Sequence, residues 1–376
     1  MFLKKSGVRV LIKAVVCSLF AVGLAEANAN DDRYAQISRE IEMIAAETYG
    51  PDQPGAAILV TLGDRELVRL AIGQADLELD VPLQPNMVFR IASLSKQFTA
   101  AAIMRLQDEG RLLIDDTVGM HLPDYPEHGA SITLRQLLNQ TSGLNSSHTH
   151  ARNDLSVEEV IDQFADLPLS FQPDSKFEYN NNNYILLGAI IERVSGQSYG
   201  DYLASAFFEP LGMSSTRYDN PRTIIEGRAN GYMGGVENTT NAAYVSMSVP
   251  YAAGALVSTV DDLLVWNRAL FGGDAVSEHA VTQMTAETVE MTPSGHDHGH
   301  HDGVAGEYGF GLFVGEVAGL PKYSHSGGIE GFGAYNLYVP SADLSIVILQ
   351  NSSSWDHPQV LAERFAEIIL ERWTEE

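Results

Sequence analysis

A serine and a lysine three residues apart are the side chains of this sequence best suited to covalent chemistry. Ser93 and Lys96 lie in the run FRIASLSKQF, at the start of an apolar stretch that predicts a helix as far as Gly110. Residues three apart share one face of a helix, so the Lys96 amine can reach the Ser93 hydroxyl and accept its proton. The alternative is a serine that caps the helix beside a solvated lysine. Lysine is scarce after residue 30, where only Lys96, Lys176 and Lys322 occur, and this favours the catalytic interpretation.

A tyrosine and an asparagine further along the chain could serve such a nucleophile. The segment from Tyr179 to Asn181 precedes an apolar run at 184–191. A tyrosine whose pKa falls beside a lysine can pass the serine proton to a leaving group, and an amide can hold a substrate carbonyl. The alternative is a polar loop that caps the next helix while Tyr179 merely packs. The same Y-x-N pattern occurs again at Tyr218, which shows that it arises easily.

A histidine followed by small residues forms the third candidate element. His325, Ser326, Gly327 and Gly328 lie on a predicted edge strand, where small side chains let a substrate backbone approach closely. The backbone amide of Gly328 could then pair with that of Ser93 as an oxyanion hole. The alternative is a glycine-rich turn or bulge that carries a surface histidine.

The elements that must hold these residues are strands near the two chain ends and helices between them. Strands are expected at 56–62, 66–72, 307–314, 323–326, 334–339 and 344–349, and helices at 34–44, 93–110, 131–138, 157–164, 184–194 and 358–369. The sequence therefore predicts an α+β fold (an α/β sandwich). Its sheet is predominantly antiparallel, is built from about 30–92 and 252–376, and is covered by helices. A mainly helical region of about 93–251 is inserted into it, and residues 30–376 form one catalytic domain.

The charge balance excludes two classes of partner. The chain has 23 basic and 49 acidic residues, a formal net charge of −26. Such a surface repels nucleic acid and anionic membranes, so the expected partner is a small-molecule or peptide substrate. No P-loop, G-x-S-x-G or H-E-x-x-H motif occurs in the sequence, which argues against α/β-hydrolase and zincin chemistry.

Residues 1–29 are expected to be an export signal. Four basic residues precede an apolar run at 14–25, which is short for a membrane span, and the Ala-Asn-Ala sequence at 27–29 fits a cleavage site. The alternative is an uncleaved anchor. Cys17 is the only cysteine and lies in this segment, so the mature protein would have no disulfide and no thiolate metal site. We therefore expect a periplasmic or secreted protein that has no membrane contact after cleavage.

Taken in order, these motifs resemble the serine β-lactamase-like superfamily. Its members include class C β-lactamases, low-molecular-mass penicillin-binding proteins, D-aminopeptidases and related esterases. The order S-x-x-K, Y-x-N, H-x-G matches the superfamily, and the residues before Ser93 are similar to its approach to the nucleophile. Further segments resemble its patterns, namely 137–144 (the "LLxHTSGL" turn), 210–213, 253–256 and 308–311. The likeness spans roughly residues 35–370, and the separation from Ser93 favours Tyr179 over Tyr218 as the family's tyrosine.

The resemblance implies a role for each residue of the helical part of the site. Ser93 is the acylated nucleophile, while Lys96 and Tyr179 share the general-base and general-acid work. Asn181 positions the substrate amide. Gln140 stands where the "HTSGL" turn usually has histidine, and we interpret this departure as structural. No cofactor is implied.

The resemblance also implies roles for the strand residues. His325 takes the place of the lysine in K-T-G, Ser326 and Gly327 bind substrate, and the amides of Gly328 and Ser93 form the oxyanion hole. A histidine is only partly charged near neutral pH and is a weaker anchor for a substrate carboxylate than lysine. This departure favours a peptidase or an esterase over a dedicated β-lactamase.

A histidine cluster lies outside these motifs, at His296, His298, His300 and His301. Imidazoles with interleaved aspartates could hold Zn²⁺ or Cu²⁺ weakly. We favour the alternative of a polar surface loop, because a glycine-rich segment lacks the supporting hydrogen bonds of a metal site. The site is therefore expected to contain no metal.

The predicted function is that of an exported serine hydrolase that acts through a Ser93 acyl-enzyme on amide or ester bonds. The expected substrate is a D-amino-acid peptide, as for a D,D-carboxypeptidase, or a small ester. The alternatives are an acyltransferase or transesterase, a β-lactamase, and a non-catalytic ligand-binding module on the same fold.

Overall fold

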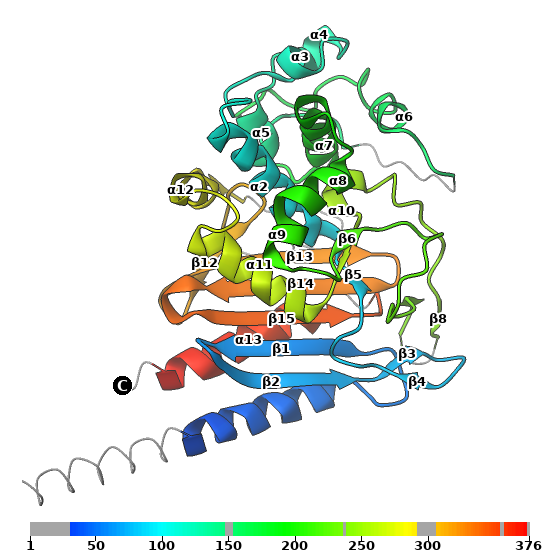
Figure 1. Cartoon of the computed structure of the whole chain (residues 1–376), viewed down its shortest axis with the longest axis vertical. Helices are drawn as coiled ribbons and strands as arrows, with labels where there is room; N and C mark the ends of the chain where they lie inside the picture. Colours follow the sequence, from blue (N-terminus) through cyan, green and yellow to red (C-terminus); the bar gives the residue numbers. More distant parts are fainter. Residues whose placement is uncertain (1–30, 147–152, 236–237, 292–305, 354–356, 374–376) are drawn as a thin grey trace, which may run out of the picture.

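The computed structural model describes residues 31–146, 153–235, 238–291, 306–353 and 357–373 (Figure 1). The expected export signal and the histidine cluster at 296–301 lie outside these residues. Within the described ranges, no helix has the length and apolarity that crossing a membrane would need.

Both chain ends contribute to one large sheet. Among the described residues, eight antiparallel strands pair in the order β10-β11-β12-β13-β14-β15-β1-β2. They are β1 (Ala56–Leu62), β2 (Arg65–Ile72), β10 (Val289–Glu290), β11 (Glu307–Tyr308), β12 (Phe313–Val317), β13 (Leu320–Ile329), β14 (Phe332–Val339) and β15 (Leu344–Gln350). The hairpin β1–β2 joins β15 in a register that runs from Ala56 opposite Gln350 to Leu62 opposite Leu344. The predicted antiparallel sheet built from both chain ends is therefore confirmed.

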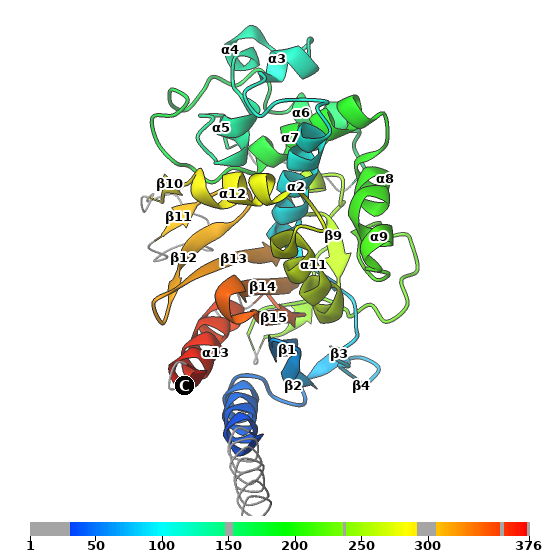
Figure 2. The ribbon, with the colours of Figure 1, turned by 60° about the vertical axis from the view of Figure 1, so that its left-hand side comes forward.

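Helices cover both faces of this sheet (Figure 2). One face packs against the helix at 31–48 and against α13 (His357–Trp373), while the other faces α11 (Val260–Gly272) and the helical part. Successive residues of β15 alternate between the two cores, with Ile346 in one and Val347 in the other. The strand is buried on both faces, which explains why its sequence is a continuous apolar run.

Three helices form the centre of the helical part. α2 (Ser95–Asp108), α7 (Asn181–Ser195) and the short α10 (Tyr251–Gly254) pack against one another. The remaining helices are η1 (Ala92–Leu94), α3 (Val118–His121), α4 (Glu127–Ala130), α5 (Leu134–Leu138), α6 (Val157–Ile161), α8 (Tyr199–Leu203), η2 (Ala204–Phe208), α9 (Glu209–Leu211), α12 (Glu278–Ala286) and η3 (Pro340–Ala342). Short strands complete the chain, namely β3 (Gln74–Asp76), β4 (Val81–Pro82), β5 (Phe89–Arg90), β6 (Arg217–Tyr218), β7 (Tyr232–Met233), β8 (Thr240–Asn241) and β9 (Leu256–Ser258).

The expected strand at 307–314 is wrong in extent, because residues 309–312 interrupt it. Gly311 has a φ of 72°, and a Cβ at this position would lie 2.7 Å from the carbonyl oxygen of Lys96. The chain therefore turns between β11 and β12 so that its backbone can pack against the start of α2.

The expected edge strand at 323–326 is longer and lies inside the sheet. β13 pairs with β12 only as far as Ser324, whereas its pairing with β14 continues to Ile329. The half of β13 after Ser324 consequently has one paired side within the described sheet, and Gly327 in this half packs against η1.

Candidate active site

Ser93 lies in the single turn η1, between β5 and α2. The residue at the N-cap of α2 is Leu94, which makes no side-chain capping bond, so the alternative of Ser93 as a helix cap is wrong. Ala92 has a φ of 47°, a left-handed conformation that costs energy for a residue with a Cβ. The flanking Ile91 amide donates to the carbonyl of Leu256 in β9 and helps to hold this strained turn. Ser93 is partly exposed, whereas both of its neighbours are buried.

Lys96 is fully buried, and its amine lies among three oxygen atoms. Lys96 Nζ is 3.0 Å from Ser93 Oγ, 2.8 Å from Asn181 Oδ1 and 2.9 Å from the carbonyl oxygen of Ala253. Burial lowers the pKa of Lys96 well below its ordinary value because the ammonium loses its hydration. The neutral amine has two N–H groups and one lone pair. Since the two carbonyl oxygens can only accept, they take the N–H groups, and the lone pair faces the Ser93 hydroxyl.

The structure distinguishes the two candidate tyrosines. The ring centroid of Tyr179 is 4.7 Å from Lys96 Nζ. Tyr218 lies on β6 and donates its hydroxyl to the carbonyl of Met247 at 2.9 Å. Tyr179 therefore lies beside the lysine, and Tyr218 belongs to a different part of the helical region.

Asn181 reaches Lys96 because it is the first residue of α7. The helix is capped by Asn180, whose side-chain oxygen accepts the amide of Asn182. The expected capping loop is thus present, but the residue that caps is the neighbour of Asn181. Asn181 is exposed while its side-chain oxygen accepts from Lys96, so its amide nitrogen is suited to a substrate carbonyl.

Gln140 holds the segment that carries Tyr179. Its side-chain oxygen accepts from Asn180 N at 3.0 Å and from Asn183 Nδ2 at 2.5 Å, and its carbonyl accepts from Glu178 N at 3.0 Å. Gln140 is fully buried and has a φ of 66°. The residues on both sides of Tyr179 are therefore fixed by one amide side chain and its backbone.

His325 is fully buried in an aromatic pocket, so the alternative of a surface histidine is wrong. Its Nε2 is 3.2 Å from the Tyr308 hydroxyl, and its Nδ1 is 2.6 Å from the carbonyl oxygen of Ser326. The ring centroids of Phe313 and Tyr179 lie 4.6 Å and 6.2 Å from that of His325. Because a carbonyl can only accept, we assign the hydrogen to Nδ1. Both of these oxygens belong to neutral groups.

The strand of His325 packs directly against the serine turn. A Cβ on Gly327 would lie 2.3 Å from the carbonyl oxygen of Ile91 and 3.2 Å from the amide nitrogen of Ser93. The first distance is too short for any side chain, so only glycine lets β13 come this close. Gly328 and Ser326 are partly exposed on either side of the buried Gly327. The structure thus brings the Ser93 amide and this end of β13 together.

Two groups at the site have no role predicted from the sequence. They are the carbonyl of Ala253, which accepts from Lys96, and the hydroxyl of Tyr308, which contacts His325. Both lie in segments that resemble the superfamily, and that likeness is the signal that could have drawn attention to them. Their partners lie elsewhere in the chain, so no local spacing rule connects them.

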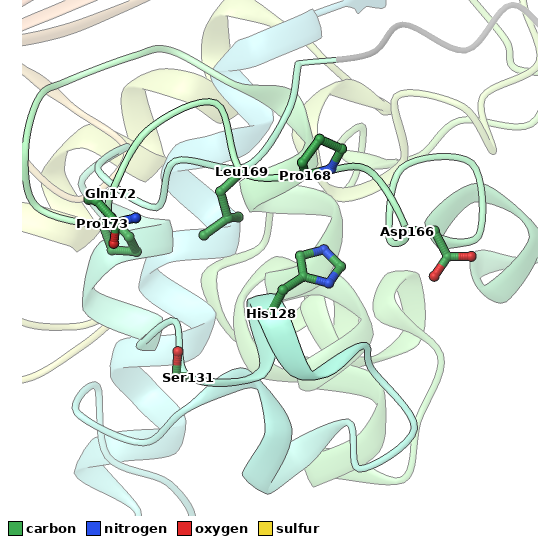
Figure 3. Close-up of a pocket in the computed structure, with 7 residues that line it drawn as sticks. All are labelled: His128, Ser131, Asp166, Pro168, Leu169, Gln172 and Pro173. Atoms are coloured by element: carbon green, nitrogen blue, oxygen red, sulfur yellow. The ribbon is translucent and has the colours of Figure 1, made fainter.

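A cavity of about 550 Å³ lies apart from this cluster, in the helical part (Figure 3). It is lined by His128, Ser131, Asp166, Pro168, Leu169, Gln172 and Pro173, none of which is a predicted site residue. His128 Nε2 is 3.0 Å from the carbonyl oxygen of Leu167. Within the ranges that the structure describes, no three His, Cys, Asp or Glu side chains gather as they would around a metal ion.

Comparison with known proteins gives a consistent set of relatives. The model of the family described as "Beta-lactamase" matches residues 43–371. Penicillin-binding protein 4* of Bacillus subtilis (strain 168) is 30% identical over 350 residues, which cover 86% of this chain and 74% of that protein. Protein flp of Staphylococcus aureus (strain NCTC 8325 / PS 47) is 28% identical over 84% of this chain. The match spans 63% of the length of flp, less than two thirds of it.

The fold is similar to that of a solved amidase. The crystal structure of D-amino acid amidase from Ochrobactrum anthropi SV3, complexed with L-phenylalanine amide, superposes with a TM-score of 0.78. The sequence identity is 24%, and the superposition covers 91% of this chain and 99% of the amidase.

Proposed function

The chain belongs to the beta-lactamase family and is a serine hydrolase of that fold, and we propose that it cleaves amide or ester bonds of substrates that lack a carboxylate. The proposed substrates are amides or esters of D-amino acids, or peptides whose C-terminus is blocked, and the proposed intermediate is an acyl-enzyme on Ser93. The proposed place of action is the periplasm or the medium outside the cell.

The observation that carries the proposal is the environment of the Lys96 amine. Two of the three oxygen atoms around Nζ are carbonyl acceptors, and the third belongs to Ser93. Burial lowers the pKa of this amine and so favours its neutral form over that of an exposed lysine. The amine is therefore available as the base that activates the serine.

The reaction follows from this arrangement. Lys96 Nζ takes the proton of Ser93 as Oγ attacks the substrate carbonyl carbon, and the amides of Ser93 and Gly328 stabilise the oxyanion. Tyr179, beside Lys96, relays the proton to the leaving nitrogen or oxygen, and the carbon–heteroatom bond breaks to leave an ester on Ser93. Water, deprotonated by the same pair, then attacks this ester and releases the acid.

The substrate class follows from the other end of the site. His325 stands where the superfamily has a lysine that attracts a carboxylate, but its ring is buried and contacts the neutral oxygens of Tyr308 and Ser326. Such a group offers a carboxylate little attraction, which disfavours C-terminal D-alanine and β-lactams. The fold likeness to a D-amino acid amidase supports D-amino acid amides as the first substrates to test.

The proposal that the protein is exported is supported only by the sequence of the expected export signal. Residues 1–29 have the basic, apolar and small-residue pattern of a signal peptide. Mass spectrometry of the N-terminus of protein isolated from the periplasm or the medium would test this. Intact leader on a cell-associated protein would contradict it.

The experiment for the activity is a substrate panel with intact-mass measurement of the protein. The panel contains D-phenylalanine amide, L-phenylalanine amide, a D-alanine ester and benzylpenicillin, and Ser93→Ala is the control. We expect turnover of the D-amide or the D-ester, an acyl adduct on the wild-type chain alone, and slower acylation by benzylpenicillin.

Two outcomes would overturn the proposal. Equal turnover by the wild type and Ser93→Ala would exclude Ser93 as the nucleophile. Acylation by benzylpenicillin that is faster than by the carboxylate-free ester would exclude the substrate class while leaving the nucleophile in place.

A further inference from the structure

A second cavity, of about 450 Å³, is lined by residues of α6, α7, α8 and α10 and of neighbouring segments. None of the residues that surround Ser93 lines it. Aromatic rings and polar or charged side chains both line it, and its volume is that of an ordinary small-molecule site.

Three tyrosines form one wall of this cavity. The ring centroids of Tyr199, Tyr218 and Tyr251 lie 5.2 to 6.2 Å from one another, and Phe208 lines the cavity as well. Aromatic rings offer an apolar surface together with negative π faces. The wall is therefore suited to an apolar body that carries a positive charge.

The Tyr251 hydroxyl is buried and makes no hydrogen bond of ordinary geometry to a described residue, but the Glu192 side chain is close enough to interact with it. Tyr251 is 4% exposed and has a φ of 39°, which is strained for a residue with a side chain. Leaving a buried hydroxyl without a partner costs free energy, so such groups call for an explanation. A ligand in the cavity that Tyr251 lines could complete the hydrogen bonding of this hydroxyl.

The helix segment at one side of the cavity has an unusual conformation. Ala204–Phe208 (η2) forms a π-helical turn, and both of its end residues line the cavity. π-helical turns are rare and often occur at functional sites, because they displace side chains from the ordinary helical positions. This observation is independent of the Tyr251 hydroxyl and points to the same cavity.

The charged groups around the cavity favour a cation. Glu192 and Asp201 supply two carboxylates, and burial together with the Glu192 carboxylate raises the pKa of Tyr251. Among the described residues that line the cavity, the one basic residue is Arg217, an exposed side chain whose guanidinium donates to the carbonyl of Ser214. The chain as a whole has a formal charge of −26, which attracts cations to its surface.

We propose that this cavity binds a small amphipathic amine, with its apolar part against the tyrosine wall and its ammonium group beside Glu192. The cavity is connected to the active site through α10. Tyr251 begins this helix, and the carbonyl of Ala253 two residues later accepts from Lys96. The cavity residue Tyr199 contacts Thr99 through their hydroxyls at 2.7 Å, and Thr99 donates to the carbonyl of Ala252.

The test uses N,N-dimethyl-2-phenylethylamine as the probe. A tertiary amine cannot take the acyl group from Ser93 to form a stable amide, so the probe is not consumed as an acceptor. Binding to the full-length purified protein is measured by calorimetry, and 2-phenylethanol is the uncharged control. We expect the amine to bind and the alcohol to bind at least about tenfold more weakly, as for loss of a charge-assisted hydrogen bond.

Two variants separate this site from others. Glu192→Gln keeps an oxygen that can accept from the Tyr199 amide but removes the charge, and it should weaken amine binding by about tenfold. Ala204→Phe should fill the cavity and abolish binding. Asp166→Asn removes a carboxylate that lines the other cavity and should leave the affinity unchanged.

Kinetics with the ester substrate locate the probe. Inhibition or activation with an unchanged KM is expected, since the cavity residues do not overlap those around Ser93. An apparent KM that rises linearly with the amine concentration would show that the probe competes with substrate in the active site, and it would overturn the proposal. Equal affinities of the wild type and Glu192→Gln, or no binding of the amine, would overturn it as well.

Discussion

The two halves of the site are built on opposite principles. In the serine half, formed by Ser93 and Lys96, a buried amine is surrounded by oxygen atoms that take its hydrogens and leave its lone pair directed at the nucleophile. In the histidine half, formed by His325, Tyr308 and Phe313, a buried ring is surrounded by aromatic groups and held by neutral oxygens. Both halves are buried, but only the first has a proton acceptor aimed at the reacting atom.

Burial alone therefore does not define the role of an ionisable side chain. Burial lowers the pKa of Lys96 and so favours the neutral amine, which is the form that we propose as the base. The same burial makes His325 a poor anchor for an anion, since a fully buried ring presents no exposed group to it. The predictions below test whether each half depends on the feature assigned to it.

The largest effect is expected from Lys96→Arg. An arginine cannot be deprotonated at working pH, so the variant should lose the base and acylate Ser93 at least about 10³-fold more slowly. The measurement is the rate of acyl-adduct formation by intact mass. Circular dichroism must show that the variant is folded, and a rate within about tenfold of the wild type would refute the assignment of Lys96 as base.

The next effect is expected from Gly327→Ala, which separates the strand from the serine turn. The new Cβ would lie 2.3 Å from the Ile91 carbonyl, so β13 must shift away from the amide of Ser93. Misplacement of an oxyanion donor costs about 10²-fold in kcat. The measurement is kcat for the ester substrate.

The matched control for this variant is Gly315→Ala on β12. A Cβ there has its closest contact with the Lys322 side chain, at 3.4 Å, which is an ordinary distance. The control should keep full activity. If Gly327→Ala also kept full activity, the close approach of β13 would not be needed for catalysis.

The sequence predicts the serine half better than the histidine half, and the reason is distance along the chain. Ser93 and Lys96 are three residues apart, so helical geometry alone places them together. The sheet is also predictable, because alternating burial gives strands such as β15 a distinct composition. By contrast, the contact between Tyr308 and His325 joins residues on two strands that are not adjacent in the sheet. The turn at Gly311, which separates β11 from β12, depends on packing against α2 and so is not visible in the local sequence.

The pH dependence of stability probes the serine half without any substrate. Lys96 has an ordinary pKa of 10.5 in the unfolded chain and a much lower one in the folded protein. Between these two pKa values the unfolded chain holds more protons, so the free energy of unfolding rises with pH, by up to about 1.4 kcal/mol per pH unit. Above 10.5 the rise from this group ends.

Lys96→Met removes this contribution. The slope of the unfolding free energy against pH, measured by urea denaturation, should be lower in the variant than in the wild type over that window. Other groups titrate equally in both proteins, so the difference in slope belongs to Lys96. Equal slopes would mean that the buried amine stays charged.

The smallest effect is expected in the histidine half, from Tyr308→Phe. The change removes only the hydroxyl that contacts His325 Nε2, so the ring loses one of its two hydrogen bonds described above. We expect kcat/KM to fall by about five- to tenfold, as for the loss of one neutral hydrogen bond. Tyr335→Phe is the matched control, because Tyr335 is also buried on this sheet. Its hydroxyl donates to Glu363 and lies 3.1 Å from Ser324 Oγ, on the face that packs against α13. Both variants should lose similar stability, so a similar loss of activity in both would show that Tyr308 acts through the fold. A loss of activity in Tyr308→Phe alone, together with a changed pH profile of kcat/KM, would show that the Tyr308 hydroxyl orients His325. The pH profile changes only if removal of the hydroxyl alters how the His325 ring binds its proton.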